Sequence, residues 1–294
     1  MKKITIFANC QGEALYKYFE EIGIADEFFL IKVAPIQTLR GKDIERVEAA
    51  VSEADIVFAQ YISDSYFIKR FSSSLLLQKV QEKSKIITFP NFYFDGFFPH
   101  LGMLRGVRSA LHLVHDYNIV AGYLAGMSVY EIIELTQSNE FYTKEMSERF
   151  FDSSLSELKR REVEYSLLNG SKIIENHFKE KRLFNQFNHP TRQFFSMFFD
   201  CVKNVLPEFS DFSLPSLGTD YLDHIKCPLY PSTHQNLQLK FENPIKFNAN
   251  GRSLSAEEIT ERFYFDYQKT DKSLLEEAMS SKQWVSENIK RLGY

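Results

Sequence analysis

The sequence contains few of the residues that mark specialised classes of protein. It has only three cysteines in 294 residues, Cys10, Cys201 and Cys227, and their spacing fits neither a disulfide framework nor a zinc site. No uninterrupted apolar run approaches the roughly 20 residues that cross a bilayer, and no apolar leader precedes the first strand. We therefore expect a cytoplasmic protein without a bound metal, a membrane span or a secretion signal.

Clusters of basic residues are also missing. The formal net charge is −4, and lysines and arginines are spread along the chain, so the electrostatic signature of nucleic-acid binding is absent. Aromatic residues, by contrast, make up 15% of the chain, and some of them are expected to line a pocket or a partner surface. For any single phenylalanine, packing in the core is the simpler interpretation.

Short apolar runs alternate with helical patterns from Lys2 to Phe89. Strands are expected from Lys2 to the residue before Asn9 and over residues 27–34, 55–59 and 85–89, with helices over residues 13–22, 43–54 and 65–83. This alternation predicts βαβ units, a mainly parallel sheet and a three-layer α/β/α fold.

Polar side chains follow several of these strands. They are Asn9, Cys10 and Gln11 after the first strand, Gln60 after the third and Asn91 after the fourth. Parallel sheets bind ligands just beyond the carboxyl ends of their strands, so we expect these residues at one edge of the sheet.

Cys10 lies between the first strand and the first helix. The N-terminus of a helix carries partial positive charge, which favours a thiolate and makes Cys10 a candidate nucleophile. The alternative is a buried, small apolar residue, the commoner environment of a free cysteine. Its polar neighbours favour the first interpretation.

The rest of the chain is expected to extend this domain. Residues 116–181 are predicted to form a helical insertion, with capping boxes at Ser128 and Ser154 and a solvated charged face over residues 157–164. A returning strand is expected over 182–187 and an apolar helix over 193–206. A capping box at Ser255 is expected to open a late helix, and residues 273–292 are predicted to form the last one. The predicted division is therefore an α/β catalytic domain, 1–206, and a C-terminal extension, 207–294, which has an irregular arm followed by helices and packs on the same domain.

Acyl transfer needs a nucleophile or an activated hydroxyl, a base, and donors for the developing oxyanion. Cys10 could supply the nucleophile, and His189, which follows the returning strand, could supply the base. For His189, capping of the next helix or a place in the core is the alternative. The absence of G-x-S-x-G argues against a serine hydrolase, and Gly12 alone does not make a dinucleotide-binding G-x-G-x-x-G.

Three further features are weaker. The aromatic loop over residues 91–100 is expected to line a pocket, although a structural loop is an equal alternative. Arg105 and Arg108 are predicted on a helix, where they could reach a phosphate or remain solvated. His112 and His115 are expected on one helical face without the further ligands that a metal needs.

Three motifs together resemble one family. Asn9-Cys10-Gln11-Gly12, Pro90-Asn91-Phe92-Tyr93 with Pro99-His100, and Phe187-Asn188-His189-Pro190-Thr191 resemble the WcbI family of bacterial capsular polysaccharide biosynthesis proteins. The resemblance implies a layout similar to that of SGNH esterases and flavodoxin-like folds, with the cysteine turn replacing a serine turn. It also implies binding of coenzyme A and acetyl-coenzyme A.

The resemblance implies that Cys10, Gln11, Asn91 and His189 line an acyl-coenzyme A site. We expect Cys10, His189 and Gln11 to be the catalytic residues. The candidates for oxyanion and substrate contacts are Asn9, Gln60, Asn91, Tyr93, His100 and Asn188. The candidates for coenzyme A contacts are Gly12, Lys17, Arg105, Arg108 and Arg192.

The expected function is transfer of an acetyl group from acetyl-coenzyme A to a sugar hydroxyl. Either Cys10 carries the acetyl group as a thioester, or His189 deprotonates the acceptor directly while Cys10 and Gln11 shape the pocket. The alternatives are an SGNH-like glycan esterase and a non-catalytic glycan-binding component. Expected partners are the acyl donor, a saccharide acceptor and other enzymes of polysaccharide biosynthesis.

Overall fold

The computed structural model describes all residues, Met1–Tyr294, and the chain forms two compact units. The sheet unit contains Met1–Tyr93, Ser156–His177 and His189–Leu222, and the helical unit contains Phe94–Leu155, Phe178–Asn188 and Asp223–Tyr294. The chain passes between the units several times, so neither unit corresponds to one continuous stretch. The division predicted after residue 206 stays a prediction.

The sheet unit is built on a four-stranded parallel sheet. Its strands are β1 (Lys2–Phe7), β2 (Phe28–Ile31), β3 (Ile56–Gln60) and β4 (Lys85–Phe89), in the order β2-β1-β3-β4. The register sets Phe7 beside Ala59, and Ala59 beside Thr88. The carboxyl ends of β1, β3 and β4 are therefore neighbours at one edge, as the alternation predicted.

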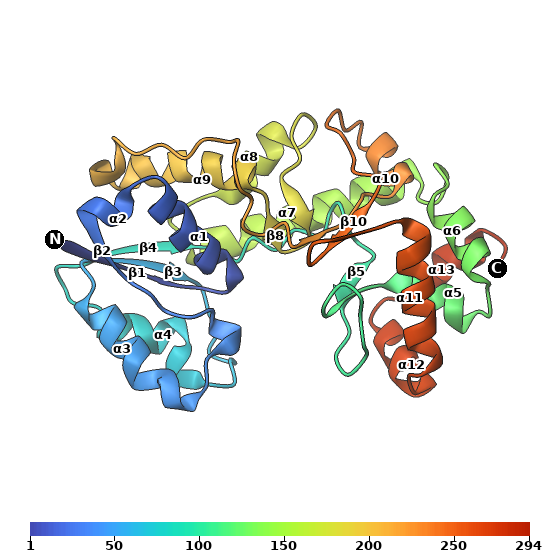
Figure 1. Ribbon diagram of the computed structural model, residues 1–294, viewed down its shortest axis with the longest axis horizontal. Helices are drawn as coiled ribbons and strands as arrows, with labels where there is room; N and C mark the ends of the chain where they lie inside the picture. The colour runs from blue at the N-terminus through green and yellow to red at the C-terminus, as the bar shows by residue number, and fades with distance from the viewer. The chain divides into compact units, whose positions relative to one another are not determined.

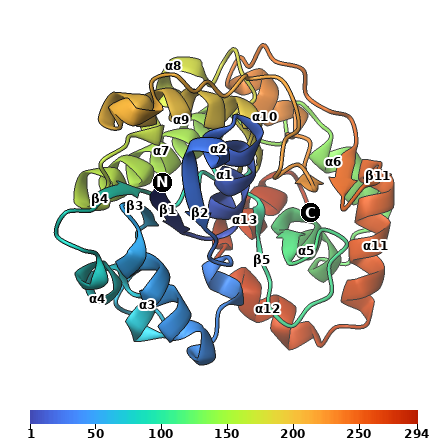
Figure 2. The ribbon, with the colours of Figure 1, turned by 60° about the vertical axis from the view of Figure 1, so that its left-hand side comes forward.

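Helices cover both faces of this sheet, which confirms the three-layer fold (Figures 1 and 2). On one face, Phe58 of β3 packs edge-to-face with Phe19 of α1 (Cys10–Glu21), and Phe19 also contacts Phe199 of α9 (Arg192–Val205). On the other face, Val57 and Ala59 share a core with residues of α3 (Ile44–Glu53) and α4 (Ser73–Leu76). Alternate side chains of β3 thus enter opposite cores, as expected of a strand buried on both faces.

Gly12 allows a close approach between α1 and the sheet. An added Cβ there would lie 2.7 Å from Cβ of Ala8 and 3.2 Å from Cγ2 of Ile6. Glycine at this position therefore lets the first turn of α1 lie directly against β1. This packing role accounts for Gly12 independently of the coenzyme A contact that the resemblance implies.

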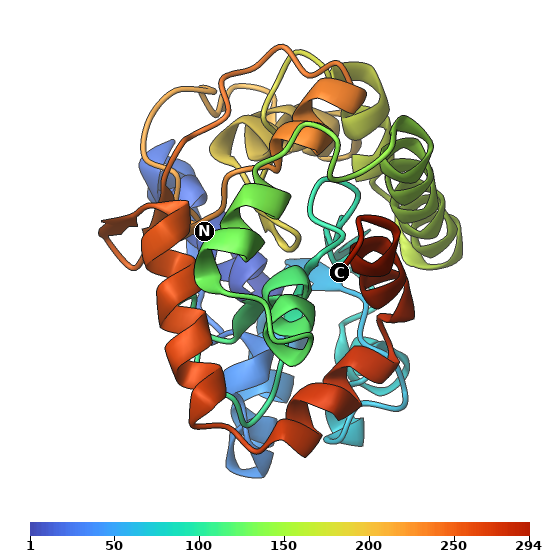
Figure 3. The ribbon, with the colours of Figure 1, turned by 90° about the vertical axis from the view of Figure 1, so that its right-hand side faces the viewer.

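The helical unit is organised around α5 (Tyr117–Leu124). Figure 3 shows α11 (Ala256–Gln268), α12 (Lys272–Ser280) and α13 (Gln283–Arg291) arranged around it. The remaining elements of this unit are β5 (Leu101–Met103), β6 (Val114–Asp116), α6 (Val129–Thr136), β7 (Phe184–Gln186), β9 (Ile225–Lys226), α10 (Pro231–Asn236), β10 (Phe247–Ala249) and β11 (Arg252–Leu254). The capping boxes expected at Ser128 and Ser255 begin α6 and α11.

Two long predicted helices are wrong. Residues 65–83 form only short turns around α4, because the serines there bond to the backbone in competition with a helix. For example, Oγ of Ser73 accepts from the backbone nitrogen of Ile62. The last predicted helix, 273–292, is divided into α12 and α13 at Ser281 and Lys282.

Three further local predictions are also corrected. Ser154 starts no helix, because it lies inside α7 (Lys144–Tyr165), whose chain passes from the helical unit into the sheet unit. Arg105 and Arg108 lie on the turn-rich connection between β5 and β6 and not on a helix. His112 is in a left-handed turn and His115 is in β6, so the two share no helical face.

The returning strand predicted over 182–187 is also different. β7 covers only Phe184–Gln186, belongs to the helical unit and is not a strand of the parallel sheet. None of the helices combines the length and the apolar character that crossing a bilayer requires.

Candidate active site

The turn between β1 and α1 is closed by Asn9. The side-chain Oδ1 of Asn9 accepts from the backbone nitrogen of Gln11 at 2.9 Å. The backbone oxygen of Asn9 accepts from the backbone nitrogen of Gly12, also at 2.9 Å. Asn9 is thus the N-cap of α1, and Cys10 is the first residue of the helix. The predicted tight turn that carries the thiol is confirmed.

Gln11 ties this turn to the ends of β3 and β4. Its Oε1 accepts from Nε2 of Gln60 at 2.9 Å and from the backbone nitrogen of Phe92 at 3.1 Å. Its Nε2 donates to Oδ1 of Asn91 and to the backbone oxygen of Phe92, both at 3.2 Å. These bonds use two acceptor and two donor positions, the full capacity of a primary amide. Gln11 therefore positions the site, and its N–H groups are not available to an oxyanion.

Asn9, Gln60 and Asn91 complete the network. The backbone nitrogen of Asn9 donates to Oε1 of Gln60 at 3.1 Å, and its Nδ2 donates to Oδ1 of Asn91 at 3.2 Å. Two amide donors, from Asn9 and Gln11, thus meet at the same oxygen and fix the orientation of the Asn91 side chain. The Nδ2 of Asn91, which is half-buried, makes no hydrogen bond to protein and remains a donor for a ligand.

Arg161 supports this network and was missed from the sequence. Its Nη1 and Nη2 donate to the backbone oxygens of Asn91 and Tyr93, each at 2.8 Å. The charged run around it was interpreted as a solvated face, yet the Arg161 side chain is only 20% exposed. In the sequence it is one basic residue among several, so no local signal distinguished it from Arg160, which pairs with Glu157 and Glu164.

Cys10 is half-buried at the start of α1, next to this network. Burial raises the pKa of its thiol to about 11, and the charge of Glu13 acts in the same direction. Backbone hydrogen bonds at the helix N-terminus lower the pKa, but by less than burial raises it. The expectation that the helix would hold a thiolate in the free protein is therefore wrong.

His189 lies in the sheet unit, in the short strand β8 (His189–Pro190), and is 7% exposed. It does not cap the helix that follows, because Oγ1 of Thr191 accepts from the backbone nitrogen of Phe194 at 3.3 Å. The parallel sheet consists of β1 to β4, so His189 does not follow a fifth strand of that sheet. The candidate base remains in the same compact unit as Cys10.

The two basic residues of this unit that were predicted to contact coenzyme A are engaged within the protein. Arg192 is 3% exposed, pairs with Glu21 through both terminal nitrogens and donates through Nε to the backbone oxygen of Pro215. It is a structural residue and not a free phosphate ligand. Lys17 is exposed, 3.7 Å from Glu13, with its ammonium over the ring of Tyr221.

Four predicted site residues belong to the helical unit. Asn188 is half-buried and accepts from Gln186 at 2.5 Å, while Arg105 and Arg108 are exposed. His100 is 2% exposed and stacks on Tyr230, with the ring centroids 4.0 Å apart. Burial lowers the pKa of His100 to about 3, so it is a neutral core residue.

A comparison with known protein families shows which family this chain belongs to. The family described as polysaccharide biosynthesis enzyme WcbI matches residues 3–206. The chain belongs to this family. The motifs at Asn9, Asn91 and His189 predicted this membership, and all three lie within the matched residues.

A solved structure has the same fold. It is a WcbI protein, described as a novel polysaccharide biosynthesis enzyme, in the native form without a disulfide bond between coenzyme A and a cysteine. The two proteins are 19% identical with a TM-score of 0.86, and the match covers 100% of this chain and 99% of that one. At this level of identity the likeness establishes the fold. No protein among the curated sequences matches.

The raised pKa of Cys10 predicts how this WcbI-family protein reacts with alkylating reagents. Without ligand, the iodoacetamide reaction rate at Cys10 should rise about tenfold per pH unit from about pH 7 to pH 10, because thiolate is the reactive form. Peptide mass spectrometry measures the rate. A plateau below about pH 8 would show an activated thiolate and contradict the account of burial.

Asp116, beside His100 in the core, gives a pH dependence of stability. Burial raises the pKa of this carboxyl from 3.8 to about 6, although the Tyr230 hydroxyl and the backbone nitrogen of Asn118 donate to it. The folded protein therefore binds more protons than the unfolded chain between these values. Its free energy of unfolding should fall as the pH rises through this window, by about 3 kcal/mol for this group.

The Asp116→Asn variant isolates this effect. Asparagine retains the cap of α5 but does not titrate, and the opposite acid-side contribution of His100 is common to both proteins. The difference in unfolding free energy between wild type and variant, from urea titrations at about pH 4 and 6.5, should change by about 2 kcal/mol, because these two pH values span most but not all of the titration. A difference independent of pH would contradict the raised pKa.

Proposed function

We propose that this protein transfers an acetyl group from acetyl-coenzyme A to a hydroxyl of a saccharide. The observation that carries the proposal is the position of Cys10, next to Gln11 and its hydrogen bonds to Gln60 and Phe92 at the edge of the sheet. The chain is also a member of the family described as polysaccharide biosynthesis enzyme WcbI. The description of the similar solved structure names coenzyme A and a cysteine together. We assign the corresponding place here to Cys10, which puts the thiol end of the donor at this edge.

The two routes differ in what Cys10 does. In the covalent route the thiol must ionise before it can attack the thioester, and the raised pKa of Cys10 makes that costly. In the direct route the acceptor oxygen attacks the thioester carbonyl itself. We favour the direct route, with Cys10 as part of the wall that holds the acetyl group.

Each group then has a role in the direct route. His189 takes the proton of the sugar hydroxyl as that oxygen forms the ester bond. The Nδ2 of Asn91 donates to the developing oxyanion, since it is the amide donor of the network without a protein partner. The C–S bond breaks, the thiolate of coenzyme A leaves and takes the proton from His189, and the acetyl ester and free coenzyme A are the products.

Three variants separate the roles. With acetyl-coenzyme A and a panel of monosaccharides as acceptors, His189→Gln should reduce acceptor-dependent release of coenzyme A at least about 100-fold, because the general base is lost. Cys10→Ala should retain release within about tenfold of wild type, a difference of about 1.4 kcal/mol in barrier height. Cys201→Ala is the matched control, a half-buried cysteine on α9, and should behave as wild type.

Chromatography of coenzyme A measures release, calorimetric titration measures acetyl-coenzyme A binding, and intact mass detects acetylated protein. No binding of acetyl-coenzyme A or coenzyme A would contradict the proposed function. An acetyl adduct that disappears in Cys10→Ala would replace the direct route with the covalent one. Release of coenzyme A without any acceptor, with acetate as the product, would indicate the esterase alternative.

A further inference from the structure

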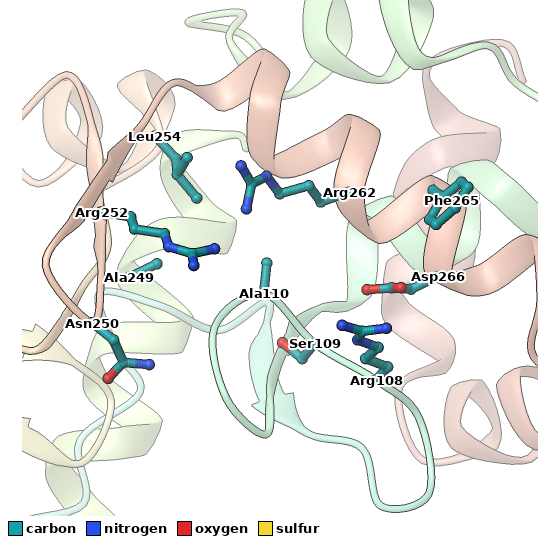
Figure 4. A pocket seen from close by; sticks show the side chains of 10 residues that line it. All are labelled: Arg108, Ser109, Ala110, Ala249, Asn250, Arg252, Leu254, Arg262, Phe265 and Asp266. Atoms are coloured by element: carbon teal, nitrogen blue, oxygen red, sulfur yellow. The ribbon is translucent and has the colours of Figure 1, made fainter.

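The helical unit contains a pocket of about 470 Å³ whose lining includes Arg108 but none of the residues of the network around Gln11. Its lining comes from the connection between β5 and β6, from the β10–β11 hairpin and from α11. Each of these three segments contributes one arginine, Arg108, Arg252 and Arg262 respectively. In Figure 4, Arg252 and Arg262 extend into the same space from facing elements, and Arg108 rises from the loop below.

None of these arginines makes an ion pair or a side-chain hydrogen bond within the protein. Several other arginines of the chain form ion pairs, for example Arg70 with Glu48, Arg160 with Glu157, and Arg192 with Glu21. Guanidinium groups that share a pocket repel one another unless an anion lies between them. The pocket is therefore arranged for a ligand of negative charge.

No acidic group forms an ion pair with these arginines, although the charge of Arg262 acts on the carboxyl of Glu258 and helps to lower its pKa. Asp266 is the one carboxylate in the lining, and it forms no ion pair. Glu258, one turn before Arg262 on α11, accepts from the backbone nitrogen of Ser255 at 2.7 Å in the capping box. Three positive charges thus face one unpaired negative charge in the pocket.

Phe265 adds an apolar surface to the same pocket. Its side chain is a large aromatic ring that is 53% exposed, with the ammonium of Lys269 3.5 Å from the ring centroid. Exposed aromatic rings beside basic groups stack on nucleobases, with about 1–3 kcal/mol per base in such sites. Guanidinium groups bind phosphates through two parallel N–H donors.

We propose that this pocket binds a nucleoside diphosphate, with the phosphates between Arg108, Arg252 and Arg262 and the base against Phe265. This chemistry is shared by two sources, the nucleotide portion of coenzyme A and the nucleotide of an activated sugar. The proposal depends on the pocket alone, so it does not require acetyl transfer at Cys10.

Calorimetric titrations of the full-length protein with ADP, UDP, GDP, coenzyme A and inorganic pyrophosphate test it. At least one nucleotide ligand should bind, and the one that binds most tightly identifies the source. Arg252→Gln and Arg262→Gln should each weaken that ligand about tenfold, through the loss of a charge-assisted contact. Arg149→Gln is the matched control, an exposed arginine of the same unit outside the pocket, and should leave affinity unchanged.

Phe265→Ala distinguishes a nucleotide site from a general anion site. It should weaken the nucleotide about tenfold while leaving pyrophosphate binding unchanged. The proposal is overturned if no nucleotide binds, if binding is unaffected by the pocket arginines, or if Phe265→Ala has no selective effect. Binding of UDP or GDP without coenzyme A would contradict the proposed acetyl transfer but support this site. Coenzyme A binding that is insensitive to all pocket variants, with no other nucleotide bound, would support the proposed function and overturn this site.

Discussion

The buried amide of Gln11 is the group on which the candidate site depends. It bonds to the side chain of Gln60 at the end of β3, to that of Asn91 after β4, and to both backbone groups of Phe92. A buried polar group left without its partner costs about 1–3 kcal/mol, so the three strand ends are held in one arrangement. This constraint places Asn9, Cys10 and Asn91 at one edge regardless of what binds there.

The same constraint explains the state of the thiol. The turn that brings Gln11 into the network also places Cys10 against the protein interior, and burial there outweighs the charge at the helix N-terminus. A thiol that stays protonated is a weak nucleophile. The free donor of the network, Nδ2 of Asn91, faces no competing protein acceptor and is held in place by Arg161 through the adjacent backbone. The site thus combines a rigid donor with a weakly reactive sulfur.

The sequence allowed the sheet and its polar edge to be predicted because both follow from local pattern. Apolar runs that alternate with helical patterns place the ends of β1, β3 and β4 side by side, and Asn9, Gln60 and Asn91 are the residues that follow. The irregular conformation of the aromatic loop over residues 91–100 was predictable for a similar reason, because Gly96 and Pro99 interrupt regular structure within the loop itself. The serines around α4 show the limit of this approach, because their competition with the backbone overrides an apolar periodicity.

Roles that depend on tertiary contacts could not be predicted. Nothing in the sequence separates the roles of Arg192 and Arg161, yet the first pairs with Glu21 and the second donates to the backbone oxygen of Asn91. His100 stands beside a proline and an aromatic loop, and only the packing on Tyr230 shows that it is a core residue. The pocket of the helical unit joins Arg108 to Arg252 and Arg262, which are distant in the sequence.

The central claim is that Gln11 and its partners act as one cooperative unit at the sheet edge. A double-mutant cycle of Gln11→Ala and Gln60→Ala, measured by urea unfolding, tests it most directly. The account predicts a coupling free energy of about 1–2 kcal/mol, because the two amides share a buried hydrogen bond, whereas Gln11→Ala with Thr38→Ala should be additive within about 0.5 kcal/mol. Additivity in the Gln11 and Gln60 cycle would contradict it.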